Sequence, residues 1–187
     1  MLSKTIVENM LKLIRLGALL LLLPMSSVFA DEEGLSDYLL GTGDLLSIHV
    51  FEEEGLSLEL RLSDAGTIAY PFLGEIKAKG LRVGNLTAFI KKGLADGYLV
   101  NPVVSVTVLE YRQFYINGQV EKPGGYAYLP GLTLQKAVAL AGGFTERASK
   151  QKIFVIHDDR ESQQPIKLEL SSAIRPGDVV TIEESFF

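Results

Sequence analysis

The stretch 115–144 constrains the fold more than any other part of the sequence, because strand formers, chain breakers and a capped helix follow one another there. Residues 115–120 favour a strand, and the cluster Lys122-Pro123-Gly124-Gly125 interrupts it. Tyr126-Ala127-Tyr128 then favours a second short strand. This order predicts a hairpin-like pair of strands at the start of the stretch.

A helix is predicted in the second half of the same stretch. Thr133 is a good helix N-cap, and Leu134, Val138 and Ala141 recur at the spacing of one helix face. Gly142-Gly143 stops the helix where a left-handed C-terminal cap is expected. Strand, turn, strand, capped helix and glycine stop together predict a small sheet that holds one helix.

The N-terminus has the pattern of a secretory signal peptide. Lys4, Lys12 and Arg15 precede the apolar run 16–23, and small residues stand at the cleavage positions before Ala30. We expect cleavage after Ala30, so that residues 1–30 are the signal peptide. The alternative is an uncleaved membrane anchor, but the apolar run is far shorter than the ~20 residues that span a bilayer.

Composition and charge exclude several classes of function. The chain has 187 residues, of which 47% are hydrophobic and 22% are charged, as in ordinary globular proteins. Its net charge is −5, and its basic residues are scattered apart from the pair Lys91-Lys92, so we expect no nucleic-acid partner. Without cysteine the chain has no disulfide, no thiolate chemistry and no Cys-rich zinc site. Asp31 stands where a lipoprotein would carry its lipidated cysteine, so we expect a periplasmic protein that is not lipid-anchored.

Residues 38–109 alternate between strand and helix patterns. Strands are expected at 45–51, 56–62, 67–70, 75–78 and 103–109. Between the last two, Val83, Leu86, Ile90 and Leu94 share one face of a predicted helix that ends near Asp96-Gly97. We therefore expect a second β-rich unit with one main helix.

Two short motifs in this region do not predict ligand sites. Gly41-x-Gly43 lacks the third glycine of a dinucleotide fingerprint, since Leu46 occupies that position, and Asp44 would repel phosphate. Gly43-Asp44 is instead typical of a turn whose aspartate caps its own backbone before a strand. Glu52-Glu53-Glu54 has no surrounding ligand spacing for a cation, so we interpret it as a solvated loop.

The stretch 115–144 resembles the soluble-ligand-binding β-grasp (SLBB) module. The matching pieces are Gly118-Gln119-Val120, Lys122-Pro123-Gly124-Gly125-Tyr126, Leu132-Thr133-Leu134 and Ala141-Gly142-Gly143-Phe144. These anchors are mostly turn and core residues. They identify a fold and name no ligand.

The preceding region resembles the polysaccharide export (PES) domain of the outer-membrane polysaccharide export family. The matching pieces are Gly43-Asp44, Gly66-Thr67-Ile68, Tyr70-Pro71-Phe72-Leu73-Gly74, Gly80-Leu81 and Asn101-Pro102-Val103-Val104. Arg82 departs from the family, which often has a helix-capping Thr there. In this family the export domain is followed by a β-grasp module, and the module here opens at about Arg112. The resemblance implies an α+β chain with an export domain at 31–111 and an SLBB β-grasp domain at 112–187, each β-rich with one main helix.

The C-terminal region completes the second domain. Residues 151–156 and 166–170 favour strands around a polar loop at 158–165. Gly177-Asp178 then repeats the Gly43-Asp44 pattern before a strand at 179–182, and we interpret both as one turn-into-strand solution. Some family members continue into a helix that lines an outer-membrane pore. The five residues after this strand are too few for such a helix, so the resemblance implies a separate outer-membrane protein as partner. Phe186 and Phe187 either pack locally or dock a partner.

Catalysis finds no support in the sequence. His49 and His157 stand alone in or beside strands, where a structural or surface role is the usual one. Asp44 and Asp178 are the tempting carboxylate pair, but their turn motifs already explain both. We therefore predict no enzyme, no catalytic, metal or cofactor residues and no cofactor, and the sequence identifies no ligand-binding residue.

The resemblance implies a periplasmic, ring-forming subunit of a machine that exports capsule or exopolysaccharide. Its expected partners are the polysaccharide chain, further copies of itself and an inner-membrane co-polymerase or chain-length regulator. The alternative is a soluble periplasmic module that binds a glycan or small ligand without forming a channel. Five tyrosines suit core packing, with interfaces or sugar stacking as alternative roles: Tyr98, Tyr111, Tyr115, Tyr126 and Tyr128.

Overall fold

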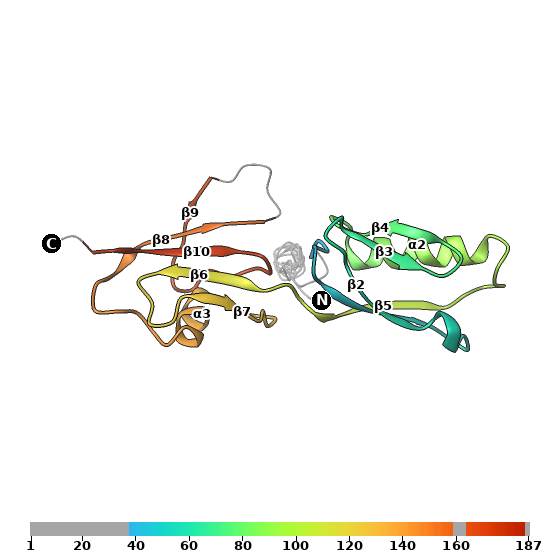
Figure 1. The fold of residues 1–187 in the computed structure, drawn as a ribbon, viewed down its shortest axis with the longest axis horizontal. Helices are drawn as coiled ribbons and strands as arrows, with labels where there is room; N and C mark the ends of the chain where they lie inside the picture. Colours follow the sequence, from blue (N-terminus) through green and yellow to red (C-terminus); the bar gives the residue numbers. More distant parts are fainter. Residues whose placement is uncertain (1–37, 159–163, 186–187) are drawn as a thin grey trace, which may run out of the picture. The chain divides into compact units, whose positions relative to one another are not determined.

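The structure is a computed structural model that describes residues 38–158 and 164–185. The predicted signal peptide at 1–30 lies outside the described residues, as do Phe186, Phe187 and the middle of the polar loop at 158–165. The described part is an α+β fold whose sheets and helices form two β-rich domains, as the sequence predicted (Figure 1). No helix within it is long and apolar enough to cross a membrane.

The export domain combines a three-stranded sheet, a two-stranded sheet and one helix. Its elements are β1 (Leu45–Val50), the 3-10 helix η2 (Glu54–Leu56), β2 (Leu58–Arg61), β3 (Thr67–Tyr70), β4 (Gly74–Lys77), α2 (Val83–Ala95) and β5 (Val104–Glu110). The larger sheet has the antiparallel order β2-β1-β5, and β3 pairs with β4. The helix α2 packs against β5.

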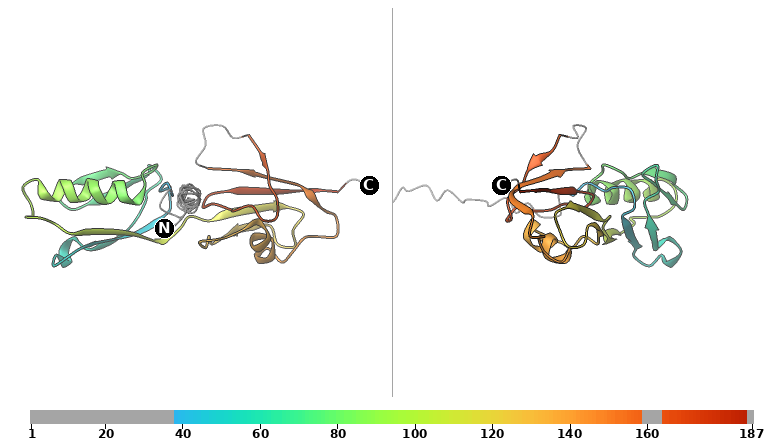
Figure 2. Two further views of the ribbon diagram at one scale, coloured as in Figure 1. Left: turned by 180° about the vertical axis from the view of Figure 1, so that it is seen from behind. Right: turned by 60° about the vertical axis from the view of Figure 1, so that its left-hand side comes forward.

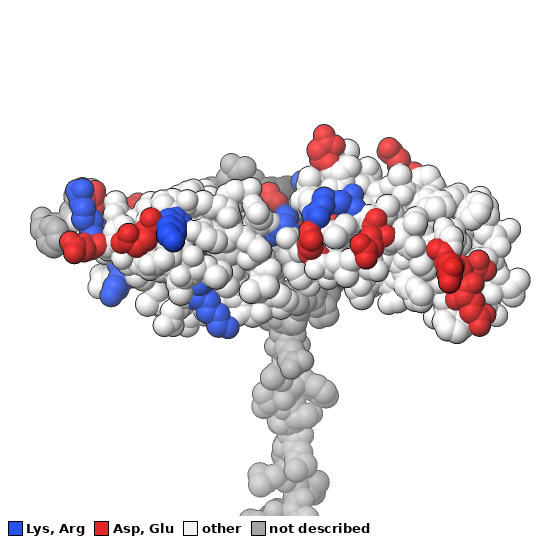
Figure 3. All heavy atoms as spheres, turned by 60° about the horizontal axis from the view of Figure 1, so that its bottom comes forward, with Lys and Arg blue, Asp and Glu red and all other residues white. Residues whose placement is uncertain are grey.

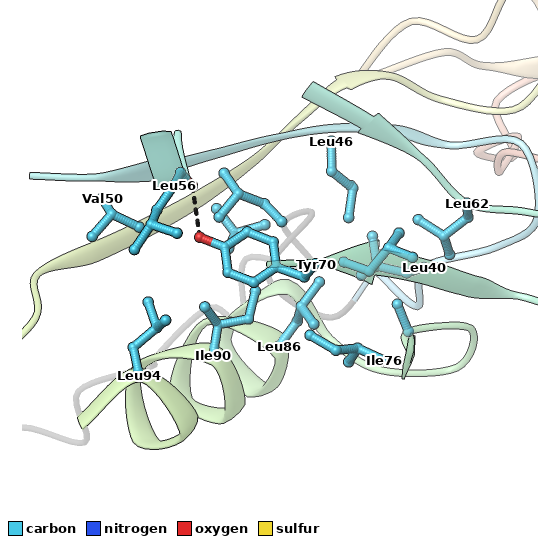
Figure 4. Close-up of a cluster of buried hydrophobic side chains, with 14 residues drawn as sticks. Leu40, Leu46, Val50, Leu56, Leu62, Tyr70, Ile76, Leu86, Ile90 and Leu94 are labelled. Carbon is cyan, nitrogen blue, oxygen red and sulfur yellow. Dashed lines mark hydrogen bonds between the residues drawn. The ribbon is translucent and has the colours of Figure 1, made fainter. Parts of the chain in front are cut away.

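The core of the export domain lies between the apolar face of α2 and the strands. Leu86, Ile90 and Leu94 are buried on the helix face that the sequence predicted, and they point toward the strand side chains in Figure 4. Tyr70 is buried among them, and its hydroxyl donates a 2.6 Å hydrogen bond to the Leu56 carbonyl. This bond satisfies the single polar atom that Tyr70 brings into the core.

The second domain is the predicted β-grasp. Its elements are β6 (Phe114–Gly118), β7 (Gly124–Tyr126), α3 (Leu134–Leu140), β8 (Ala148–Ile156), β9 (Ile166–Lys167) and β10 (Val179–Glu184). The sheet order is β7-β6-β10-β8-β9, with β10 parallel to β6 and antiparallel to β8. The helix α3 lies on one face of this sheet in both views of Figure 2, and Leu134, Ala137 and Val138 are its buried residues.

The ends of α3 have the predicted caps. The Thr133 side chain accepts a hydrogen bond from the Lys136 N–H. Gly142 and Gly143 have positive φ angles of 84° and 100°. Gly142 N–H donates to the Ala139 carbonyl and Gly143 N–H to the Val138 carbonyl, which is the Schellman pattern. By contrast, the Arg82 side chain makes no capping hydrogen bond at the start of α2.

Several predicted strand bounds were wrong. The second strand of the opening stretch, predicted at 126–128, is β7 at Gly124–Tyr126, where Gly125 pairs with Tyr115. A Cβ on Gly125 would stand 2.9 Å from the Tyr115 ring, so this strand glycine accommodates a cross-strand aromatic side chain. The strand predicted at 56–62 is shortened to β2, because Leu56 ends η2 instead. The strand predicted at 166–170 retains only Ile166–Lys167.

Candidate functional site: the linker at Arg112

Arg112 lies in the short connection between β5 and β6, and it contacts turns of both domains. On the export side the contacts involve Tyr38 and Asp44, and on the β-grasp side they involve Asp158 and the turn at Gly177. We call these residues, together with His157 and Asp178, the linker cluster. It contains both buried aspartates of the described residues, and buried carboxylates are common in functional sites.

Asp44 is fully buried and accepts three short hydrogen bonds. Its Oδ2 accepts from the Gly41 N–H at 2.8 Å and from the Tyr38 hydroxyl at 2.6 Å. Its Oδ1 accepts the backbone N–H of Arg112 at 2.8 Å. The first bond is the self-capping turn that the sequence predicted, and the third ties this turn to the linker.

Asp178 repeats the same turn before β10. Its Oδ2 accepts from the Arg175 N–H at 2.8 Å, the same three-residue spacing as between Asp44 and Gly41. Its Oδ1 lies 2.7 Å from Nδ1 of His157, which donates to it in the tautomer that carries the Nδ1 proton. The two Gly-Asp motifs therefore form the same turn, in which the aspartate accepts the N–H three residues earlier.

The Arg112 guanidinium approaches the backbone of both turns closely. Nη1 donates to the Tyr38 hydroxyl at 2.6 Å and lies 3.5 Å from Asp44 Oδ2, while Nε lies 3.3 Å from Asp158 Oδ2. A Cβ on Gly41 would stand 1.9 Å from Nη1, and one on Gly177 would stand 2.5 Å from Nε. Glycine at both positions leaves the space that the guanidinium occupies.

Three tyrosine rings flank the linker in edge-to-face pairs. Tyr111 lies 5.1 Å from Tyr38 and 5.3 Å from Tyr128 between ring centroids, with interplanar angles of 76° and 73°. Such pairs are favourable beyond the area they bury. Because Tyr38 precedes β1 and Tyr128 follows β7, these contacts join residues of both domains around Tyr111.

Burial dominates the electrostatics of the linker cluster. It raises the pKa of the Tyr38 hydroxyl strongly, and the hydrogen bond to the Asp44 carboxylate adds to this rise. Burial also raises the pKa of the Asp178 carboxyl, although the Arg175 N–H and His157 oppose the change. The pKa values of Tyr111 and Tyr128 rise mainly through burial as well. Tyr38 therefore stays a neutral hydrogen-bond donor at any physiological pH.

The contacts of the linker cluster stabilise the fold around the linker. The oxygens of both buried carboxylates are occupied by donors of the protein itself, so neither carboxylate is presented to a substrate. Within residues 38–158 and 164–185, no group of three or more His, Asp or Glu side chains is placed to hold a metal ion. The cluster offers hydrogen bonds and charge pairing that fix the linker backbone, and the arrangement contains no activated nucleophile.

The remaining residues singled out in the sequence lie apart from one another. His49 is exposed and its Nδ1 lies 3.2 Å from the Ser57 hydroxyl, whereas His157 belongs to the linker cluster. Among the tyrosines, Tyr126 packs against the β-grasp core, but core packing was the wrong interpretation for Tyr98 and Tyr115, which are 49% and 47% exposed. The sequence did not indicate that Arg112 and Tyr38 contact Asp44. The position of Arg112 between two domain motifs was the only available signal.

Comparisons with known families agree with the two domains. The family described as "Polysaccharide biosynthesis/export protein" matches residues 32–109, and the SLBB domain matches residues 113–167. Residues 32–109 therefore carry the domain of the polysaccharide export family, and an SLBB domain follows it. Arg112 falls between the two matched segments, so the linker cluster lies where one domain passes into the next.

Curated relatives carry names from the same process. The chain is 31% identical to the exopolysaccharide production protein ExoF of Rhizobium meliloti over 72% of its own length and 35% of ExoF. It is 26% identical to the EPS I polysaccharide export outer membrane protein EpsA of Ralstonia nicotianae, over 79% of the chain and 47% of that relative. It is 27% identical to the polysialic acid transport protein KpsD of Escherichia coli, over 66% of the chain and 23% of KpsD. The chain thus spans less than half the length of these relatives.

Proposed function

We propose that this protein is a non-enzymatic periplasmic subunit of a polysaccharide export machine. The observation that carries the proposal is the ordered pair of an export domain and an SLBB domain, joined at Arg112. The names of ExoF, EpsA and KpsD support a role in moving capsule or exopolysaccharide. Asp44 and Asp178, the buried carboxylates of the linker cluster, already accept hydrogen bonds from the protein, which favours a structural role for both.

The proposed mechanism is physical. Identical subunits pack side by side in heterologous contacts, which close into a ring when the rotation between neighbours allows it. Such a ring encloses a passage for a hydrated glycan and contacts an inner-membrane co-polymerase on one side. A linker held by hydrogen bonds to both domains would give every subunit the same shape, which ring closure requires. The separate outer-membrane partner and the domain limits 31–111 and 112–187 stay predictions.

Deletion of the gene in a polysaccharide-secreting strain tests the function. We expect extracellular polysaccharide to fall to background and to return when the full chain is supplied from a plasmid. A chain with Tyr115→Phe serves as matched control, because the Tyr115 side chain is exposed and its hydroxyl lies outside the linker cluster. Unchanged secretion after deletion would contradict the proposal.

Mass measurement in solution tests the ring. Analytical ultracentrifugation of the purified protein, over a range of concentrations, should show closed oligomers of one size. A strict monomer at every concentration that still binds an oligosaccharide would instead favour the alternative, a soluble glycan-binding module.

A further inference from the structure

Three loops of the export domain each contain a non-glycine residue with left-handed backbone, and they meet at one place. The non-glycine residues with left-handed backbone among the described residues are Glu52, Phe72 and Asn101, with φ angles of 63°, 64° and 54°. They lie after β1, in the β3–β4 turn and between α2 and β5. Asn tolerates this conformation, but for Phe it is an outlier that costs about 1–2 kcal/mol. Strain of this kind is retained where the surrounding structure uses it.

The same three loops border a cavity of about 370 Å³. Its walls include Glu53, Leu56, Pro71, Phe72, Tyr98 and Leu99, and we call this cavity the aromatic groove. The volume lies within the range of small-ligand sites. The strained Phe72 belongs to its wall, so the strain places an aromatic ring at the groove.

Phe72 and Tyr98 form an exposed aromatic platform in the groove. Their ring centroids are 4.8 Å apart with an interplanar angle of 30°, and their exposed fractions are 63% and 49%. The Tyr98 hydroxyl reaches back to the Phe72 carbonyl at 3.4 Å. At this distance the two tilted rings pack against one another. The half or more of each side chain that stays exposed is apolar surface on which an amphipathic ligand can stack.

Carboxylates stand beside this platform. Glu53 lines the groove, and its neighbours in the sequence, Glu52 and Glu54, are also acidic. Figure 3 shows acidic side chains gathered at the right-hand end of the export domain, with no basic side chain beside them on the face drawn. Carboxylates accept hydrogen bonds from hydroxyl groups and repel anions.

We propose that the aromatic groove binds a neutral hexose segment of a glycan. The apolar C–H face of a pyranose ring would lie on Phe72 and Tyr98, and its hydroxyls would donate to Glu53. The adjacent glutamates exclude chains rich in uronic or sialic acid from this groove. The glycan's source rests on the proposed export function, whereas the binding chemistry stands on the groove alone.

Titration of the purified full chain with neutral and acidic oligosaccharides tests the proposal. Cellotetraose and maltotetraose are the neutral probes, and tetragalacturonate is the acidic comparator, each followed by calorimetry and by NMR shifts of the aromatic side chains. We expect at least one neutral probe to bind at least tenfold more tightly than tetragalacturonate. Phe72→Ala and Tyr98→Ala should each weaken neutral binding at least tenfold.

Two further variants sharpen the result. Tyr115→Ala removes an equally exposed aromatic side chain of the β-grasp domain, so it should leave binding unchanged. Phe72→Gly should abolish binding while raising the melting temperature, because glycine adopts the left-handed backbone without strain. Glu53→Gln removes one negative charge from the groove, so it should reduce the ratio of the affinity for neutral probes to the affinity for tetragalacturonate.

The results test glycan binding in the aromatic groove independently of the export function. The proposal is overturned if no neutral probe binds, or if Tyr115→Ala weakens binding as much as Tyr98→Ala. It is also overturned if Phe72→Ala blocks secretion in cells while neither neutral probe binds, because the platform would then dock a protein. Secretion that survives gene deletion, together with groove binding, would reject only the export function.

Discussion

The turns at Asp44 and Asp178 share one motif but differ in what they hold. In both, a buried aspartate accepts the N–H three residues earlier through Oδ2. At Asp44 the other oxygen fixes the linker backbone through the Arg112 N–H, and a guanidinium lies 3.5 Å away. At Asp178 the other oxygen meets an imidazole. Both turns border the linker, but only the Asp44 carboxylate itself bonds to it, whereas the Asp178 carboxylate bonds within its own domain.

Burial raises the pKa of Asp178, whose partners oppose the rise without abolishing it. The two turns differ in the partner, distant in the chain, that the second carboxylate oxygen contacts.

The largest expected effect comes from removing the carboxylate of the linker turn. Asp44→Ala leaves the Gly41 and Arg112 N–H groups and the Tyr38 hydroxyl without their acceptor in a buried site. We expect the free energy of unfolding to fall by about 3–5 kcal/mol. Asp178→Ala, which strands fewer donors and removes an unfavourably buried charge, should cost about 2–3 kcal/mol. Urea denaturation followed by circular dichroism measures both, and equal losses would show that the linker contacts add nothing.

Arg112→Ala tests the shared element of the comparison. Truncation removes a nearly buried guanidinium from Asp44 and Tyr38, so we expect a loss of about 2–3 kcal/mol. Hydrogen exchange should speed up at the Asp44 turn more than at the Asp178 turn. Arg147→Ala is the matched control, because Arg147 pairs with Glu184 on the surface of the β-grasp domain, where such a loss stays below about 1 kcal/mol. Similar losses in the two variants would contradict the role given to Arg112.

Tyr38→Phe removes one donor from the export turn and keeps the ring contact with Tyr111. Because the lost hydrogen bond goes to a carboxylate, we expect a cost of about 1–2 kcal/mol. Tyr115→Phe, at an exposed hydroxyl, should change stability by less than about 0.5 kcal/mol. If the two variants unfold at the same urea concentration, the Tyr38–Asp44 bond contributes nothing measurable.

The smallest effect is a pH dependence specific to the Asp178 turn. Since burial raises the pKa of Asp178 above its unfolded value, its protonated form favours the folded state. This contribution is fully present below the unfolded pKa of about 3.9 and is lost as the pH rises through the folded-state value. Asp178→Asn should therefore gain stability relative to the wild type as the pH rises over that interval. Parallel denaturation series at several pH values measure this difference, and a constant difference would reject the assigned direction.

Sequence reasoning was sufficient where a pattern is local. The face of α2, the Thr133 cap, the Gly142-Gly143 stop and both Gly-Asp turns follow from residues a few positions apart. The linker cluster was not predictable in the same way, because Arg112 lies 68 positions from Asp44. Nor does the sequence indicate the backbone of Phe72, since aromatic residues rarely adopt a left-handed conformation and carry no signal for it.

The place of β10 in its sheet also fixes an order of events during synthesis. This strand lies between β6 and β8 at the centre of the sheet, yet it follows both of them in the sequence. Until it leaves the ribosome, β6 and β8 have open edges and the β-grasp core is incomplete. The export domain also closes its sheet with its last strand, when β5 pairs with β1, but it does so earlier in the chain. The β-grasp domain is therefore the last part of the described chain to complete its core.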